Sequence, residues 1–360
     1  MQNQRFCVSV EDYVVELIRG QRKAPLLKPF LALLSQGVRL GVAIRNFAYD
    51  IGLFSSHRLP AYVISVGNIT AGGTGKTPCV QLLASHLKEK LSLAILTRGF
   101  GSHLEKTRRI AQVDPRQEKA AYLYGDEPVL LAKNTSVPVW VGVDRLKSGS
   151  LAIAQGAQCL LLDDGMQHRR LARDIEIVVV DALDPFSQKR FLPYGFLRDS
   201  LSRLKTATLI VATQVHTLEQ YKQIKEQLLP WSSAPVVGVR VEILNASSLP
   251  EGVALFCSLG NPERFLQTVC DLNRTVVHTW FKKDHAPFSE QELVTFATTA
   301  RAKGACALVC TEKDAVKLPS GISCGLPLIV LRMQLRIVEG EEHWQGIEEI
   351  AKLALRVKKR

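Results

Sequence analysis

The sequence lacks the closely spaced cysteines that disulfide frameworks and zinc sites require. Its 360 residues include eight cysteines, scattered along the chain with no Cys-x-x-Cys pair. Several of them lie within apolar, strand-like runs. We therefore expect reduced, mostly buried thiols in a cytoplasmic protein. The cysteines are Cys7, Cys79, Cys159, Cys257, Cys270, Cys306, Cys310 and Cys324.

A secretory signal and a nucleic-acid-binding stripe are also missing. The chain opens on polar residues, carries the acidic pair Glu11-Asp12, and has no small-residue cleavage site after an apolar core. Its formal net charge is +12, yet no basic stripe with interleaved aromatics is present. We therefore expect no nucleic acid as partner, and instead a nucleotide, a phospholipid surface or a phosphorylated substrate.

No uninterrupted apolar run is long enough for a clear spanning helix, which needs about 20 residues with few charges. Residues 25–54 come nearest, but Lys28, Arg39 and Arg45 interrupt their apolar helical pattern. This segment is amphipathic and basic, and two interpretations stay open. It either lies in the headgroup region of an anionic membrane leaflet or packs on the core as an ordinary helix.

What the chain does have is the composition of a folded protein. Hydrophobic residues make up 46% and charged residues 22% of the sequence, which is typical of a soluble or peripheral protein. The length predicts about two domains, or one large α/β domain.

A glycine-rich loop follows the β-branched run at residues 63–66. It ends in Gly-Lys-Thr and precedes a helix-permissive segment, the layout of a P-loop between strand and helix. Such a loop wraps a polyphosphate with backbone N–H groups, while Lys76 reaches the outer phosphates and the Thr77 hydroxyl ligates magnesium. Thr70 departs from the usual leading glycine. The predicted nucleotide-binding residues are Thr70, Ala71, Gly72, Gly73, Thr74, Gly75, Lys76 and Thr77.

Strands and helices alternate after this loop, which predicts a mostly parallel sheet with helices on both faces. The strand at 93–96 leads into Arg98-Gly99-Phe100-Gly101, placed at the sheet edge where ligands bind. The apolar run at 159–162 ends in Asp163-Asp164, a Walker B arrangement that holds magnesium.

Two turns carry further candidate residues. Gly125-Asp126-Glu127-Pro128 places two adjacent carboxylates before a short helix. The proline- and glycine-containing loop at 190–199 directs Arg198 and Asp199 towards the sheet edge.

The C-terminal third predicts a smaller α/β domain. Residues 236–242 and 328–335 alternate like exposed strands and are expected to pair as a connecting ribbon, with the small domain between them. A helical tail starts at Glu341 and ends in basic residues. The expected divisions are 1–58 for the membrane-associated segment, 59–235 for the P-loop core, 236–335 for the second domain, and 336–360 for the tail.

The ordered set of motifs resembles the tetraacyldisaccharide 4'-kinases of lipid A biosynthesis, the LpxK family. The resemblance runs from the N-terminal amphipathic segment to at least Lys317. The matching motifs are Val66-Gly67-Asn68, Arg98-Gly99-Phe100-Gly101, Gly125-Asp126-Glu127-Pro128, Asp163-Asp164-Gly165-Met166-Gln167-His168, Leu197-Arg198-Asp199, Asp284-His285 and Thr311-Glu312-Lys313-Asp314-Ala315. Met166 and Asp199 depart from the family, which usually has an aromatic residue and a glutamate there.

The resemblance implies transfer of the ATP γ-phosphate to the 4'-hydroxyl of a tetraacyl disaccharide 1-phosphate. It implies a monomer bound peripherally to the cytoplasmic face of the bacterial inner membrane, with ATP and Mg²⁺ as cofactors. Asp126 is similar to the family's general base and His285 to its partner, while Lys76 neutralises the transferred group. Implied substrate contacts are Arg98, Gly99, Phe100 and Arg198. The implied magnesium shell is Thr77, Glu127, Asp163, Asp164 and Asp199.

Two other P-loop classes are the alternatives. A GTPase or metallochaperone reads guanine with Asn/Thr-Lys-x-Asp, but here Lys313 and Asp314 are adjacent. An ATPase of the partitioning type carries a lysine shortly before the loop glycines, where this chain has Ala71.

Overall fold

The computed structural model describes residues 10–319 and 321–358, with side chains placed from 13 to 319 and from 321 to 351. Cys7 and the side chains of the basic tail, Arg356 to Arg360, lie outside the described residues. Five of the other cysteines are buried, whereas Cys270 and Cys306 are exposed. The expectation of mostly buried cysteines is therefore confirmed for the described part.

Within the described chain, the strands form a nine-stranded and a four-stranded sheet. The large sheet has the order β13-β8-β7-β6-β1-β5-β2-β4-β3. It is parallel except at β3 and β13, as the strand–helix alternation predicts. Its strands are β1 (Tyr62–Gly67), β2 (Leu93–Thr97), β3 (Ala111–Gln112), β4 (Val139–Val141), β5 (Cys159–Asp163), β6 (Ile175–Asp181), β7 (Leu209–Thr213), β8 (Val236–Ile243) and β13 (Met333–Glu339).

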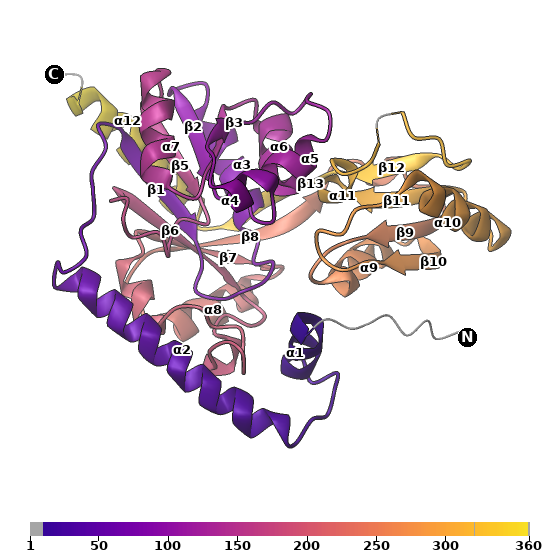
Figure 1. Cartoon of the computed structure of the whole chain (residues 1–360), viewed down its shortest axis with the longest axis horizontal. Helices are drawn as coiled ribbons and strands as arrows, with labels where there is room; N and C mark the ends of the chain where they lie inside the picture. The colour runs from indigo at the N-terminus through magenta and orange to yellow at the C-terminus, as the bar shows by residue number, and fades with distance from the viewer. Residues whose placement is uncertain (1–9, 320, 359–360) are drawn as a thin grey trace.

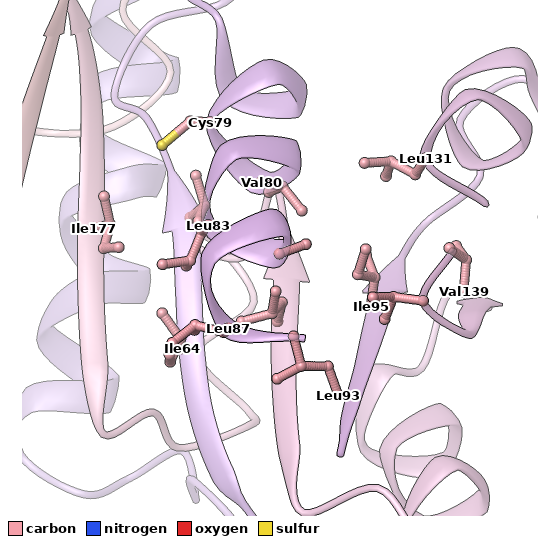
Figure 2. Close-up of a cluster of buried hydrophobic side chains, with 14 of the residues drawn as sticks. Ile64, Cys79, Val80, Leu83, Leu87, Leu93, Ile95, Leu131, Val139 and Ile177 are labelled. Atoms are coloured by element: carbon pink, nitrogen blue, oxygen red, sulfur yellow. The ribbon is translucent and has the colours of Figure 1, made fainter. Parts of the chain in front are cut away.

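Helices cover both faces of this sheet because its central strands are apolar on both sides. In β5, Cys159 and Leu161 pack into one core cluster, while Leu160 and Leu162 pack into the cluster on the opposite face. Figure 2 shows α3 lying over the first face. The helices of this domain are α3 (Lys76–Leu87), α4 (His103–Thr107), α5 (Ala120–Tyr124), α6 (Asp126–Thr135), α7 (Arg145–Ala154) and α8 (Leu218–Leu228).

The smaller sheet forms the second domain, at the right in Figure 1. Its order is β10-β9-β11-β12, with all pairs parallel. Its strands are β9 (Gly252–Cys257), β10 (Thr275–Phe281), β11 (Ala307–Thr311) and β12 (Leu328–Leu331), and its helices are α9 (Pro262–Asp271), α10 (Glu290–Ala302) and α11 (Glu312–Ala315).

The expected ribbon exists in a modified form. β8 and β13 pair antiparallel, as predicted. The predicted single strand at 328–335 is wrong, because it divides into β12 in the small sheet and β13 in the large one. β8 also pairs with β7, so the ribbon extends the large sheet. We propose that 236–238 and 333–358 belong with the P-loop core.

The helical tail also returns to the core. In α12 (Glu341–Lys358), Trp344 is 1% exposed and Glu348 lies 2.6 Å from His86 of α3. The C-terminal helix therefore supports the helix that follows the glycine-rich loop.

Two helices precede the core: α1 (Val10–Ile18) and α2 (Leu27–Asp50). α2 runs along the outside of the larger domain (Figure 1). Its large apolar side chains face outward, with Leu33 71%, Leu40 61% and Phe47 62% exposed. The alternative of an ordinary core-packed helix is therefore wrong for α2. By length and composition alone, α2 is long and apolar enough to cross a membrane.

Candidate active site

The glycine-rich loop connects the central strand β1 to α3. Gly75, with φ of 90°, ends the loop in a left-handed conformation immediately before Lys76. A Cβ atom at Gly75 would lie 3.1 Å from the Thr213 side chain, so a larger residue is disfavoured. The Asn68 side chain donates to the Thr74 hydroxyl at 2.7 Å inside the loop. These contacts fix the loop before α3, and a helix N-terminus suits an anion.

Thr70 and Ala71 hold the loop in place from outside. The N–H of Ala71 donates to the Phe196 carbonyl at 2.6 Å, and Thr70 forms a bridge with Leu197. The Ala71 N–H is thus engaged by the protein and does not serve as a phosphate donor in this structure. We propose a narrower cradle, residues 72–77, in which Thr70 and Ala71 have an anchoring role.

Asp163 sits at the tip of β5 and is 2% exposed. Burial, followed by the nearby carboxylates of Glu127 and Asp164, raises the pKa of Asp163 to about 7. Thr97 donates to one carboxylate oxygen at 3.4 Å, and the other has no hydrogen-bond partner among the described residues. A buried, unpaired carboxylate oxygen beside two more carboxylates fits a bound cation.

Asp164 lies between two cations. Arg198 donates to both of its oxygens, one bond being 2.9 Å long, and the Lys76 ammonium is 3.8 Å away. Burial alone would raise the pKa of Asp164, but the Arg198 hydrogen bonds and the Lys76 charge lower it to about 2. The structure therefore brings together Lys76, Asp164 and Arg198, as the motifs predict.

The residues fit magnesium delivered with a nucleotide better than a metal held by protein alone. Among the described residues, no group of three or more His, Cys, Asp or Glu side chains is arranged to hold a metal ion. Magnesium usually keeps several waters and takes one or two protein ligands beside phosphate oxygens. The free oxygen of Asp163 and the Thr77 hydroxyl at the start of α3 could supply these one or two protein ligands.

Asp126 and His285 meet across the two domains. The His285 Nδ1 lies 3.0 and 2.9 Å from the two Asp126 oxygens. Asp126 is 5% exposed at the start of α6. The hydrogen bond to Asp126 raises the pKa of His285, although burial opposes this rise. The structure thus brings together the predicted base and its partner.

Lys313 completes this junction, and sequence reasoning gave it no role. Its ammonium lies 3.1 Å from Glu127, 3.3 Å from Asp284 and 3.5 Å from the His285 Nε2. Burial would lower the pKa of Lys313, but the charges of Glu127, Asp126 and Asp284 raise it. The available signal was its position after the predicted strand at 307–310, where the second sheet presents its carboxyl edge.

The segment after β2 flanks the junction. Phe100 is 66% exposed, and its ring centroid lies 5.8 Å from that of His285. Arg98 pairs with Glu105 at 2.5 Å and remains largely exposed. Position 99 requires glycine for a structural reason. Its φ is 69°, and a Cβ atom added there would lie 2.4 Å from the Val141 side chain. Phe100 and Arg98 are therefore exposed beside the junction, whereas Gly99 permits the chain to turn.

Asp199 has other partners than the predicted magnesium shell. It is fully buried, and its oxygens accept hydrogen bonds from Arg45 at 3.0 Å and Asn46 at 2.8 Å, both on α2. Gln167 donates to it at 3.4 Å. We propose that Asp199 anchors α2 to the core in place of ligating the metal.

Comparison with known proteins gives one consistent family. Residues 27–352 match the family model described as tetraacyldisaccharide-1-P 4'-kinase, LpxK. The tetraacyldisaccharide 4'-kinase of Syntrophus aciditrophicus is 36% identical over 86% of this chain and 90% of its own. That of Nitrosococcus oceani is 38% identical over 86% and 87%.

Among solved structures, the chain is similar to LpxK from Aquifex aeolicus, crystallised in complex with ATP. The TM-score is 0.70 and the identity 27%, covering 90% of this chain and 99% of that one. The shared motifs, the fold and these matches together show that the chain belongs to the LpxK family of tetraacyldisaccharide-1-P 4'-kinases.

Proposed function

We propose that this chain transfers the γ-phosphate of ATP to the 4'-hydroxyl of a tetraacyl disaccharide 1-phosphate in lipid A biosynthesis. The observation that carries this proposal is the Asp126–His285 pair, 2.9 Å apart and contributed by two domains. Asp126 is followed by Glu127, whose charge acts on Lys76, the first residue of α3. Family membership supplies the acceptor class.

The loop residues bind the nucleotide. Residues 72–77 surround the phosphates with backbone N–H groups, and Lys76 neutralises charge on the transferred group together with Arg198. Thr77 and Asp163, with Glu127 and Asp164 nearby, would hold Mg²⁺, which supplies charge neutralisation on the β- and γ-phosphates when bound.

The dyad handles the acceptor proton. Asp126 accepts the hydroxyl proton, and His285 shares it through their hydrogen bond. As the acceptor oxygen bonds to the γ-phosphorus, the bond from that phosphorus to the β–γ bridging oxygen breaks. ADP leaves with the bonding pair. Because His285 comes from the second domain, the complete dyad requires the two domains to be closed on each other.

α2 provides the membrane contact. Its outward apolar residues and its basic residue Arg39 suit an anionic bilayer surface. Arg45 and Asn46 fix the C-terminal half of α2 to Asp199, which favours a helix lying on the bilayer over one that crosses it. We propose a monomer bound peripherally to the cytoplasmic face of the inner membrane.

The GTPase alternative is disfavoured by the contacts of Asp314. This residue is fully buried and accepts hydrogen bonds from Ser258 and Thr311. Its carboxylate is therefore engaged within the second domain and is not presented to a guanine base.

The direct test incubates the protein with ATP, magnesium and a tetraacyl disaccharide 1-phosphate in neutral detergent micelles. We expect a product with one added phosphate and an equal amount of ADP. Lys76→Ala should abolish both, whereas Lys88→Ala, at the other end of α3, should retain both. ATP turnover without phosphorylation of the lipid would overturn the proposal.

A further inference from the structure

A cavity of about 220 Å³ lies between the α1–α2 turn and the loop at 188–194, outside the kinase site. Its lining includes Arg19, Lys28, Arg190 and Tyr194. The lining contains cations from three separate segments and no carboxylate. Such a cluster favours a small anion over a neutral ligand.

Two of the cations are available to a ligand. Lys28 and Arg190 are exposed, and the Arg190 guanidinium is held over the Tyr194 ring at 4.7 Å. A stacked guanidinium is oriented and keeps its N–H donors for an anion. Arg19 is different, because it already donates to the Gly260 carbonyl of the second domain at 2.7 Å.

The position of the cavity identifies the source of the anion. Lys28 is in the first turn of α2, next to Leu26, which is 93% exposed, and Phe30, which is 56% exposed. The cavity therefore opens beside the apolar face that contacts the bilayer in the proposed function. Its volume is below the roughly 300 Å³ at which pockets for drug-sized ligands begin, which suits a phosphate group better than a disaccharide.

We propose that this cavity binds the phosphodiester of an anionic phospholipid headgroup, distinct from the substrate of the kinase site. The proposal rests on the membrane contact of the proposed function. Bound headgroups fix the orientation of α2 on the bilayer, because Lys28 and Arg190 connect the helix and the 188–194 loop to the same lipid.

Vesicle co-sedimentation tests the proposal with Lys28→Gln/Arg190→Gln. The matched control is Lys147→Gln/Arg116→Gln, which removes the same charges from exposed residues of α7 and of the segment between β3 and α5. Vesicles of phosphatidylcholine alone are compared with vesicles containing phosphatidylglycerol. We expect the preference for anionic vesicles to fall roughly 5-fold per charge removed in the cavity pair, and less than 2-fold in the control. Equal losses in both pairs, or none in either, would overturn the headgroup site.

Kinase assays in neutral detergent without phospholipid test whether the cavity binds the 1-phosphate of the kinase substrate and not a phospholipid headgroup. Unchanged kcat and KM for the disaccharide 1-phosphate support the proposal. A raised KM in the cavity pair, absent with a disaccharide lacking the 1-phosphate, would show that the cavity binds the substrate and overturn it. A protein without kinase activity would contradict the proposed function, while the vesicle comparison would still test the headgroup site.

Discussion

The imidazole of His285 contacts the carboxylate of Asp126 at 2.9 Å, although 159 positions separate the two residues in the chain. Asp126 begins a helix of the P-loop core, and His285 lies in the loop that follows β10 in the second domain. The reactive pair therefore exists only when the two domains are in contact. A site divided in this way ties proton transfer to the domain arrangement.

The first prediction concerns this pair. His285→Ala should lower kcat about 10²–10⁴-fold, the usual contribution of a positioned acid–base group, and Asp126→Asn should lower it at least as much. The double variant should lose little more than Asp126→Asn alone, because the two groups act as a unit. Steady-state kinetics at saturating ATP measures this. Unchanged turnover in His285→Ala, with Asp126→Asn inactive, would contradict the dyad.

Lys313 gives the second prediction. Lys313→Met leaves Glu127 and Asp284 without their shared cation and should lower kcat/KM roughly 10–100-fold, the size expected for losing a charge-assisted hydrogen bond. The control Lys303→Met removes a charge from the exposed end of α10 and should leave kcat/KM unchanged. Thermal unfolding should separate a loss of activity from a loss of folding. If both variants kept full activity, Lys313 would have no part in the junction.

Much of the architecture follows from local patterns. The strands around the P-loop are short apolar runs that end in glycine or aspartate, and the strand–turn–helix order fixes which edge carries the site. Hence β1, β5 and the position of Asp163 agree with the prediction. The split between β12 and β13 was missed because Arg332 alone separates the apolar run of β12 from the alternating run of β13. Their different partners in three dimensions distinguish the two strands.

The contacts of Asp199 and Lys313 depend on residues remote in sequence. Asp199 follows Arg198, which was predicted to lie at the sheet edge, and this position suggested that Asp199 ligates the metal. Its partners Arg45 and Asn46 instead lie 154 and 153 positions away in the chain. Lys313 meets Glu127 across 186 positions. A single sequence contains no signal for such pairs. The motifs therefore identified the candidate residues, whereas the contacts of each residue come from the structure alone.

Asp199 provides the third prediction. Asp199→Ala leaves Arg45 and Asn46 without their acceptor, so it should destabilise the protein by about 1–3 kcal/mol, the range for an unsatisfied buried group. α2 should become more susceptible to limited proteolysis. If Asp199 instead ligated magnesium, the variant would keep its stability and need more magnesium for half-maximal rate. Urea unfolding and a magnesium titration distinguish the two outcomes.

The fourth prediction concerns the outer face of α2. Leu33→Ser/Leu40→Ser should lower partitioning into anionic vesicles tenfold or more, given about 1.5–3 kcal/mol for burying each leucine fully. Leu229→Ser changes a leucine that is 74% exposed at the end of α8 and should have no effect. Arg39→Glu should also weaken binding, through charge alone. Arg45→Glu is a poor probe, because Arg45 holds Asp199. Unchanged partitioning of the leucine pair would contradict the membrane role of α2.

Acid sensitivity of the second domain is the last prediction. Glu292 accepts from Lys282 at 2.7 Å and completes a capping box with Ser289 at the start of α10. The Lys282 hydrogen bond, followed by those from Ser289, lowers the pKa of Glu292 from 4.5 to about 2. A carboxyl with a lowered pKa in the folded state stabilises it above pH 4.5, and this contribution is lost as the pH falls from 4.5 towards 2.

Urea unfolding of the wild type and Glu292→Gln measures that contribution. At pH 7 the variant should be less stable by at most about 1 kcal/mol, because the pair and the cap are partly exposed. The difference should shrink steadily below pH 4.5, since protonation removes in the wild type what the substitution removes in the variant. If the difference in stability did not depend on pH between 7 and 3, the substitution would act by weakening the capping box. The charge of the Glu292 carboxylate would then contribute nothing to stability.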